Sequence, residues 1–361
     1  MAQDVSPIER LEMQPVAVDP ASIEAEFSRV WHETSGAGLD DSSVRLRVAN
    51  IVVLARGDAE RARFEEVMEL LPQRHPCRGI LALTDAERNA VEATISAHCW
   101  RSPGGERHIC SEEVILLGGR GNERQMASAV LALLVADIPL TVWFPGALST
   151  QGPLSEGLID QADRIMFDSA RAGDVLRVIE TAERLREEHG LVCDDLAWLR
   201  LAGWRSLMAQ LFDDAPGAAE LSRIVRITID GAPGASEPLL LAGWLIAQLG
   251  YTPADVTSAA GELRATLYAG SRAVTIVVSQ HRDVPIARVA LESPAGRFSV
   301  AWHADSGHLH VESNMDGGEP QRRVVAPTPV DDASMISMAF DGLSESDVHA
   351  RSVSAIQGLF A

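Results

Sequence analysis

Lysine is missing from this sequence, since all 31 residues counted as Lys or Arg are arginine. A phosphate-binding P-loop, a Schiff-base lysine and a Tyr-Lys dehydrogenase pair each depend on a lysine amine. The sequence therefore excludes these three kinds of catalytic site. Coding bias is the simplest explanation for the exchange of lysine for arginine, and the chemical exclusion holds whatever its origin.

Cysteine is scarce, and the four residues Cys77, Cys99, Cys110 and Cys193 show no C-x-x-C spacing. A cytosolic chain normally keeps such thiols reduced. We therefore expect reduced cysteines, with Cys77 and Cys110 as small core residues at the starts of strands. A redox switch at one of the four stays an open alternative.

Long apolar runs are also absent. No segment approaches the ~20 consecutive apolar residues that a membrane-spanning helix needs. Residues 1–10 lack the basic stretch and apolar core of a signal peptide. We expect a cytoplasmic protein that does not enter a membrane.

Acidic residues outnumber basic ones, which gives a formal net charge of −20 and a pI near 4.9. Such a charge repels nucleic acids and anionic membranes at long range. We therefore expect neither as a partner.

The length of 361 residues and a hydrophobic content of 46% exceed what a single core usually supports, so two domains are expected. A composition change at residues 213–217 marks the predicted linker. We predict an N-terminal arm with one amphipathic helix at residues 1–38, an α/β domain at 39–213 and an α+β domain at 218–361. A domain boundary near residues 160–168 is the alternative.

Strands and helices alternate in the first half of the chain. Strands are predicted at residues 44–55, 77–84, 91–97, 108–117, 140–144 and 164–167. Helices are predicted at 21–33, 59–71, 123–135, 173–189 and 195–212, the last capped by Asp194. This alternation predicts an α/β domain with a mixed or mostly parallel sheet that helices cover on both faces.

The second half begins with a predicted strand at residues 224–229 and an apolar helix at 238–249. Five short alternating strands follow, at 262–268, 273–279, 287–292, 297–303 and 308–313, with hairpin turn residues between them. We predict an α+β domain with an antiparallel meander. A closing helix near residues 333–359, broken at Gly342, is expected to pack on one face of the meander.

Arg74, His75 and Arg78 precede a strand and form the best polar cluster. Guanidinium groups bind anions and acidic surfaces through paired hydrogen bonds, so the cluster is a candidate anion or partner contact. A local role is at least as well supported, in which Arg78 pairs with Glu112 or Glu113 on a neighbouring strand.

Gly118, Gly119 and Gly121 lie between a strand and a helix, where backbone amides could hold a phosphate. The third glycine of a dinucleotide motif and its acidic residue are missing, so a tight turn is the favoured interpretation.

Other candidates have structural explanations of equal weight. Trp143, Trp198, Trp204 and Trp244 could anchor a partner or fill the core. His308 and His310 alternate along a strand near His303, but no Cys or carboxylate accompanies them, so we predict no metal and no cofactor. No G-x-S-x-G frame is present, and we predict no catalytic residue.

Several motifs follow one another between about residues 45 and 250. They are Arg-His-Pro-Cys-Arg at 74–78, Cys-Ser-Glu at 110–112, Ala-Asp-Arg-Ile-Met-Phe-Asp-Ser at 162–169, Asp-Leu-Ala-Trp at 195–198 and Leu-Ala-Gly-Trp at 241–244. In this order they resemble the glucose-6-phosphate dehydrogenase assembly protein family, OpcA. Cys77 stands where the family has Ser, and Phe144 where a second Trp is usual.

The resemblance implies a non-catalytic assembly factor or allosteric activator that binds glucose-6-phosphate dehydrogenase. It further implies a role in the oxidative pentose phosphate pathway and NADPH supply. The dehydrogenase's own sugar-phosphate site relies on lysine, so this chain is not a dehydrogenase of that kind. The competing hypothesis is a sugar-phosphate- or nucleotide-binding enzyme that uses residues 74–78 and 118–121, and a regulatory module that binds a small molecule is a third.

Overall fold

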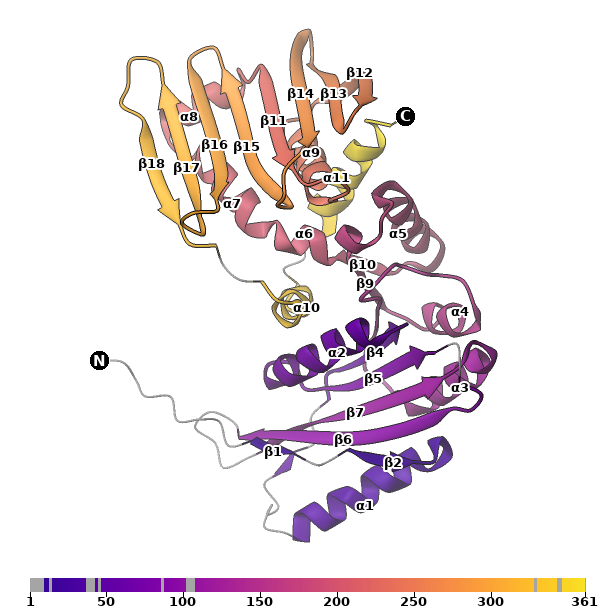
Figure 1. The fold of residues 1–361 in the computed structure, drawn as a ribbon. Coiled ribbons are helices and arrows are strands. Elements are labelled where there is room, and N and C mark those ends of the chain that lie inside the picture. The colour runs from indigo at the N-terminus through magenta and orange to yellow at the C-terminus, as the bar shows by residue number, and fades with distance from the viewer. Residues whose placement is uncertain are drawn as a thin grey trace, which may run out of the picture. The chain divides into compact units, whose positions relative to one another are not determined.

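The computed structural model describes residues 10–12, 15–36, 43–44, 47–85, 88–101, 108–327, 330–342 and 346–360. They form two compact units, each of which is described by itself (Figure 1). Unit 1 holds the described residues of Met1–Asp168, Ala182–Asp194 and Asp331–Asp341, and unit 2 those of Ser169–Thr181, Asp195–Val330 and Gly342–Ala361. None of the helices in these ranges is long and apolar enough to cross a membrane.

Unit 1 is built on a sheet of ten strands. The main path of the sheet is β1-β6-β7-β5-β4-β8-β9-β10, with β2 paired to β6 and β3 paired to β7. The strands are β1 (Arg10–Glu12), β2 (Val16–Val18), β3 (Ser43–Val44), β4 (Ala49–Ala55), β5 (Cys77–Thr84), β6 (Glu92–Arg101), β7 (His108–Gly118), β8 (Leu140–Trp143), β9 (Arg164–Phe167) and β10 (Val192–Asp195).

The centre of this sheet is parallel, with β7, β5, β4, β8 and β9 hydrogen-bonded in that order. If these five strands are numbered by their order in the chain, their order across the sheet is 3-2-1-4-5, as in doubly wound dinucleotide-binding folds. β6 is antiparallel to β7, so the sheet is mixed and the predicted α/β domain is confirmed. The strand order reverses between β4 and β8, and such sheets bind ligands beyond the carboxyl ends of the strands at that point.

Helices cover both faces of the parallel strands (Figure 1). One face carries α2 (Asp58–Leu70), on which α10 (Asp332–Phe340) packs. The other carries α3 (Glu123–Leu133), against which α4 (Pro153–Ile159) packs, and α1 (Ile23–Gly36) packs on β6. Gly79 in β5 allows α2 to approach, because a Cβ at this position would lie 2.5 Å from Sδ of Met68. Every residue of β5 before the last, Thr84, is accordingly buried, as expected for a strand covered on both faces.

Unit 2 contains an eight-stranded sheet in the order β12-β13-β14-β11-β15-β16-β17-β18. The strands are β11 (Arg226–Gly231), β12 (Thr252–Ala259), β13 (Glu262–Ala269), β14 (Arg272–Gln280), β15 (Ile286–Ser293), β16 (Gly296–His303), β17 (His308–Met315) and β18 (Gln321–Val325). Neighbours are antiparallel except that β11 runs parallel to β14. The predicted meander is therefore confirmed, with β11 inserted between its two halves.

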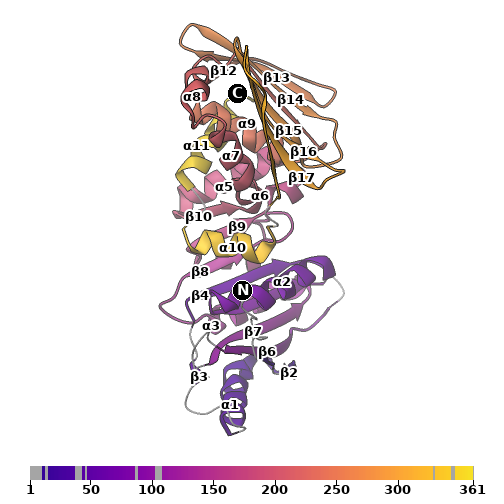
Figure 2. The same cartoon turned by 90° about the vertical axis from the view of Figure 1, so that its left-hand side faces the viewer.

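One face of the second sheet packs on helices α7 (Ala202–Gln210), α8 (Ala215–Leu221), α9 (Glu237–Gln248) and α11 (Ser346–Gln357) (Figure 2). Alternate residues of β11 are buried, among them Ile227 and Ile229. This alternation is typical of a sheet with one face on the core. Two further helices, α5 (Val175–His189) and α6 (Leu196–Arg200), precede this part of the chain.

The helix predicted at residues 195–212 is two helices, α6 and α7, divided at Leu201. The predicted cap, Asp194, is wrong by one residue. Asp195 caps α6, because its Oδ1 accepts a hydrogen bond from the amide of Ala197 at 3.0 Å. Asp194 instead pairs with Arg164 in unit 1.

The closing helix predicted near residues 333–359 is also divided, into α10 and α11. Its break at Gly342 is confirmed, and this glycine has a φ of +75°. The expected packing on the meander is wrong for α10, which packs on α2 in unit 1, whereas α11 packs along α9 in unit 2.

Residues 213–217, expected to be a linker, contain the beginning of α8. Asp214 caps this helix, because its Oδ1 accepts a hydrogen bond from the amide of Gly217 at 2.7 Å. The chain passes from unit 1 to unit 2 after Asp168, returns to unit 1 at Ala182 and enters unit 2 again at Asp195. The domain boundary, near residue 213 or in the alternative range 160–168, stays a prediction.

Candidate functional site

A crevice opens in unit 1 at the carboxyl ends of β4, β5 and β8, where the strand order reverses. Its inner part is a cavity of about 280 Å³, and its outer part has about 620 Å³. Five residues line both parts: Arg56, Thr84, Glu123, Ser149 and Gln151. We call this the switch-point crevice. Its place in the fold is the one at which doubly wound sheets bind nucleotides.

The turn from β4 to α2 lacks the chemistry of a dinucleotide site. Such a site needs several glycines between strand and helix, whereas this turn has Gly57 alone. Glu60 accepts a hydrogen bond from the backbone amide of Arg56 at 2.7 Å. A Cβ at Gly146 would lie 2.0 Å from Oε1 of Glu60. The Glu60 carboxylate thus lies at the N-terminus of α2, where it repels the pyrophosphate that this position otherwise binds.

Sequence reasoning missed the charged residues of this crevice, Arg56, Glu60, Arg120 and Glu123. Each follows a predicted strand or lies near the start of a predicted helix. That position is the signal that could have identified them, because the carboxyl ends of neighbouring parallel strands lie together.

Packing requires two of the three glycines of the phosphate-loop candidate. A Cβ at Gly118 would lie 2.5 Å from Sδ of Met126, and a Cβ at Gly119 would lie 1.9 Å from the carbonyl oxygen of Arg88. Gly121 has open space around it. The close approaches of Gly118 and Gly119 agree with the tight turn between β7 and α3 that the sequence favoured.

Arg78 and Glu112 form a buried ion pair, with Nε of Arg78 donating to Oε2 of Glu112 at 2.8 Å. The Arg78 guanidinium also donates to the carbonyl of Leu133 at 2.6 Å and contacts Glu24, while Arg47 makes a second ion pair with Glu112. Arg78 is 2% exposed and Glu112 is 1% exposed. Burial alone would lower the pKa of Arg78, but Glu112 and Glu24 outweigh it and raise this pKa. These contacts match the local role that the sequence left open.

Arg74 contacts Asp341, the residue after α10, and His75 contacts Ser337 within α10. Nη2 of Arg74 lies 3.1 Å from Oδ2 of Asp341, and Nε2 of His75 lies 2.9 Å from Oγ of Ser337. Burial lowers the pKa of His75, Asp341 opposes this and Arg74 adds to it. The structure therefore divides the predicted cluster into two sets of structural contacts within unit 1.

The four predicted aromatic anchors differ in exposure. Trp143 is 0% exposed and Trp198 is 1% exposed. The Arg205 guanidinium stacks 3.7 Å from the ring centroid of Trp198, so both rings are core residues. Trp204 on α7 and Trp244 on α9 are half-buried and keep surface that a partner could contact.

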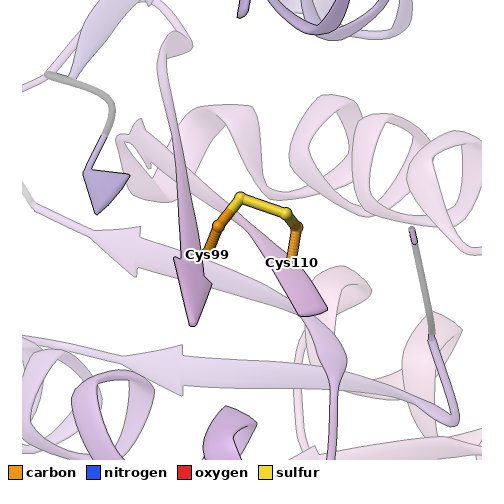
Figure 3. Close-up of a disulfide and its surroundings, with 2 residues drawn as sticks. All are labelled: Cys99 and Cys110. Carbon is orange, nitrogen blue, oxygen red and sulfur yellow. A yellow bond between two sulfur atoms is a disulfide. The ribbon is translucent and has the colours of Figure 1, made fainter. Parts of the chain in front are cut away.

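Cys99 and Cys110 form a disulfide (Figure 3), which corrects the expectation of four reduced cysteines. They lie directly opposite each other on the antiparallel strands β6 and β7, and their Cα atoms are 4.1 Å apart. Cys77 and Cys193 are free and buried. Burial raises the pKa of each to about 12, so neither forms a reactive thiolate at neutral pH.

The histidines of the second sheet lie close together. The rings of His303 and His310 stack with centroids 3.7 Å apart, and His308 lies opposite His303 in the register of β16 and β17. Within the ranges that the structure describes, no group of three or more His, Cys, Asp or Glu residues could hold a metal ion.

Comparison with known proteins identifies two family models along the chain. The model described as glucose-6-phosphate dehydrogenase subunit N-terminal domain matches residues 69–184, and the corresponding C-terminal domain matches residues 192–353.

Curated relatives carry the provisional name OxPP cycle protein OpcA. The protein from Nostoc punctiforme is 29% identical over 225 residues, which cover 60% of this chain and 47% of that protein. The protein from Synechocystis sp. is 27% identical over 194 residues, which cover 52% of this chain and 40% of that protein. The chain thus spans less than half the length of these relatives.

Solved structures share the fold. An aldose-aldose oxidoreductase from Caulobacter crescentus matches with a TM-score of 0.51 at 14% identity, over 87% of this chain and 97% of that one. An NAD binding oxidoreductase from Klebsiella pneumoniae matches with a TM-score of 0.50 at 12% identity, over 87% and 95%. At sequence identities this low, the similarity shows a shared fold and nothing about function.

The two family models match most of the chain and include the motifs on which the sequence resemblance was based. The chain belongs to the OpcA family of glucose-6-phosphate dehydrogenase assembly proteins.

Proposed function

We propose that this chain is a non-catalytic partner of glucose-6-phosphate dehydrogenase that promotes its assembly or raises its activity as an allosteric activator. The observation that carries the proposal is the family match, since both models describe a subunit of this dehydrogenase. The names of the curated relatives place them in the OxPP cycle. By this proposal the chain supports NADPH supply through the oxidative pentose phosphate pathway of the cytoplasm.

Two features support a non-catalytic role. The dinucleotide-type sheet of unit 1 has Glu60 at the position that a cofactor pyrophosphate needs. The sequence also lacks lysine, on which the sugar-phosphate site of the dehydrogenase relies. A chain that has this fold, an acidic side chain in the pyrophosphate position and no lysine is suited to bind an enzyme rather than to act as one.

An activator must bind the competent oligomer or conformation of the enzyme more tightly than the alternative, because equal affinity for both states shifts nothing. A tenfold shift in the ratio of the two states requires about 1.4 kcal/mol of differential binding. Trp204 and Trp244 are the proposed anchors, because they are the predicted tryptophans that keep exposed surface.

The test adds the purified chain to the dehydrogenase of the same organism and measures KM, kcat and oligomeric mass. We expect a complex and a change in at least one of these quantities. Absence of a complex at micromolar concentrations, with all three values unchanged, would contradict the proposal.

Substitution variants locate the contact. Trp204→Ala and Trp244→Ala remove the proposed anchors, and a true interface hot spot costs about 2 kcal/mol or more in binding. Trp302→Ala is the matched control, because Trp302 on β16 is also half-buried. Equal affinities for all three variants would exclude Trp204 and Trp244 as anchors and leave the partner proposal to the mass measurement.

A further inference from the structure

Two arginines of the switch-point crevice have no partner among the residues that the structure describes. Arg56 follows β4 and Arg120 follows β7, and both line the outer part of the crevice. Their guanidinium groups make no hydrogen bond or ion pair with any described residue, and both side chains are exposed. Two unpaired guanidiniums at one cavity form a favourable site for a phosphate group, which accepts paired hydrogen bonds from arginine.

Neutral polar groups accompany these arginines. The Thr84 and Ser149 hydroxyls and the Gln151 amide line both parts of the crevice. Hydroxyl and amide groups can donate to a ligand oxygen and accept from a ligand hydroxyl. This mixture suits a ligand that has several hydroxyl groups.

Three carboxylates also line the crevice, and two of them are engaged locally. Glu60 accepts from the backbone amide of Arg56, and Asp85 lies 3.7 Å from the guanidinium of Arg88. Glu123 makes no hydrogen bond or ion pair with a described residue and lines both parts of the cavity. An ionised carboxylate only accepts hydrogen bonds, so Glu123 favours a ligand with hydroxyl donors and repels one that is anionic throughout.

The inner cavity has an apolar floor of Leu54, Ala82 and Phe144, against which the carbon face of a sugar ring can pack. A dinucleotide is disfavoured, because Glu60 lies at the N-terminus of α2. The groups that remain are two arginines, of which Arg120 lines the outer part alone, together with a carboxylate and an amide that line both parts. They match an anionic head on a hydroxylated body.

We propose that the switch-point crevice binds a phosphorylated sugar, with the phosphate between Arg56 and Arg120 and the hydroxyls toward Glu123 and Gln151. This binding involves no bond making and requires no second protein. It therefore extends the proposed function without depending on it, and the isolated chain tests it.

The test is calorimetric titration of the chain alone with glucose 6-phosphate, glucose, inorganic phosphate and NADP+. We expect glucose 6-phosphate to bind about tenfold or more tightly than glucose or inorganic phosphate, because each fragment lacks one set of charge-assisted or polar contacts. Absence of glucose 6-phosphate binding at millimolar concentration would overturn the proposal. Equal affinity for inorganic phosphate, which indicates a simple anion site, or tighter binding of NADP+ would overturn it as well.

Variants assign the two ends of the ligand. Arg56→Gln and Arg120→Gln should each weaken glucose 6-phosphate binding about tenfold. Glu123→Gln should weaken glucose 6-phosphate binding but not the binding of inorganic phosphate. Arg61→Gln is the control, because it makes the same charge change on α2 at a residue that pairs with Glu65 outside the crevice.

The control Arg61→Gln distinguishes a specific binding site from a general effect of the protein's charge on glucose 6-phosphate affinity. Arg61→Gln should leave affinity unchanged. An equal loss in Arg61→Gln would show a long-range charge effect and overturn the assignment, as would full affinity in both Arg56→Gln and Arg120→Gln. All of these residues are exposed or half-buried, and circular dichroism shows whether each variant keeps its secondary structure.

Discussion

Removal of the Glu112 carboxylate is the sharpest test of the interpretation that Arg78 has a structural role. Glu112 pairs with both Arg78 and Arg47, and Arg78 also contacts Glu24. The substitution Glu112→Gln keeps the shape of the side chain but removes the carboxylate that Arg78 and Arg47 share. Arg78 then keeps only its contact with the Glu24 carboxylate. A buried ion pair that loses one partner destabilises a protein by about 3–5 kcal/mol, because the remaining charge stays desolvated.

The expected loss of stability is smaller when Arg78 is removed than when Glu112 is removed. Arg78→Met leaves Glu112 paired with Arg47, whose side chain is 21% exposed, so we expect a loss near the lower end of that range. The double variant Arg78→Met with Glu112→Leu removes both buried charges, and replacing a whole buried pair by apolar residues is often neutral. It should therefore be more stable than Glu112→Gln alone.

Hydrogen exchange measured by mass spectrometry is the suitable assay, because it reports on β5 and β7 separately from unit 2. A loss of about 3–5 kcal/mol corresponds to faster exchange of these strands by about 100-fold or more. Arg88→Gln is the control, since it breaks an exposed pair with Glu92 of small expected value. If β5 and β7 of Glu112→Gln exchange at rates within a factor of a few of those in the unmodified chain, the interpretation is refuted.

Three further predictions concern titratable groups. Thiol counting in denaturant without reductant should give two thiols, from Cys77 and Cys193, and four after reduction of the Cys99–Cys110 disulfide; four before reduction would contradict the disulfide. In the folded chain at neutral pH, Cys77 and Cys193 should resist iodoacetamide, because burial raises the pKa of each to about 12; rapid alkylation would contradict this. The pKa of His75 is lowered by burial from 6.5, so its neutral form stabilises the fold above that pH and the contribution is lost as pH falls through the folded-state pKa. Urea unfolding of His75→Gln should show a smaller loss of stability on acidification, and an unchanged pH dependence would argue against a contribution from His75.

The sequence specified most of the long elements but not their arrangement. The bounds of β5 and β9 match the predicted strands, because each is an apolar run that ends at polar or turn residues. The order of the sheet depends on pairing between distant strands, which periodicity does not encode. β18 was missed because its residues, Gln-Arg-Arg-Val-Val, are mostly exposed and carry no alternating apolar pattern.

Contacts between neighbouring strands were easier to predict than contacts across the chain. The pairing of Arg78 with Glu112 followed from the expectation that their strands are neighbours. The contact of His75 with Ser337 spans 262 residues, and no local pattern indicates it. The switch-point crevice was missed because the order of the strands was not predicted, and Arg56 and Glu123 come together only once β4 lies at the centre of the sheet.

We propose that a dinucleotide-type fold here binds a dehydrogenase in place of a dinucleotide. Calorimetric titration of the chain with NADP+ and, in the same buffer, with glucose-6-phosphate dehydrogenase of its own organism tests the claim directly. We expect saturable binding of the dehydrogenase at micromolar concentration and no saturable binding of NADP+. Saturable binding of NADP+ with no heat from the dehydrogenase would contradict it.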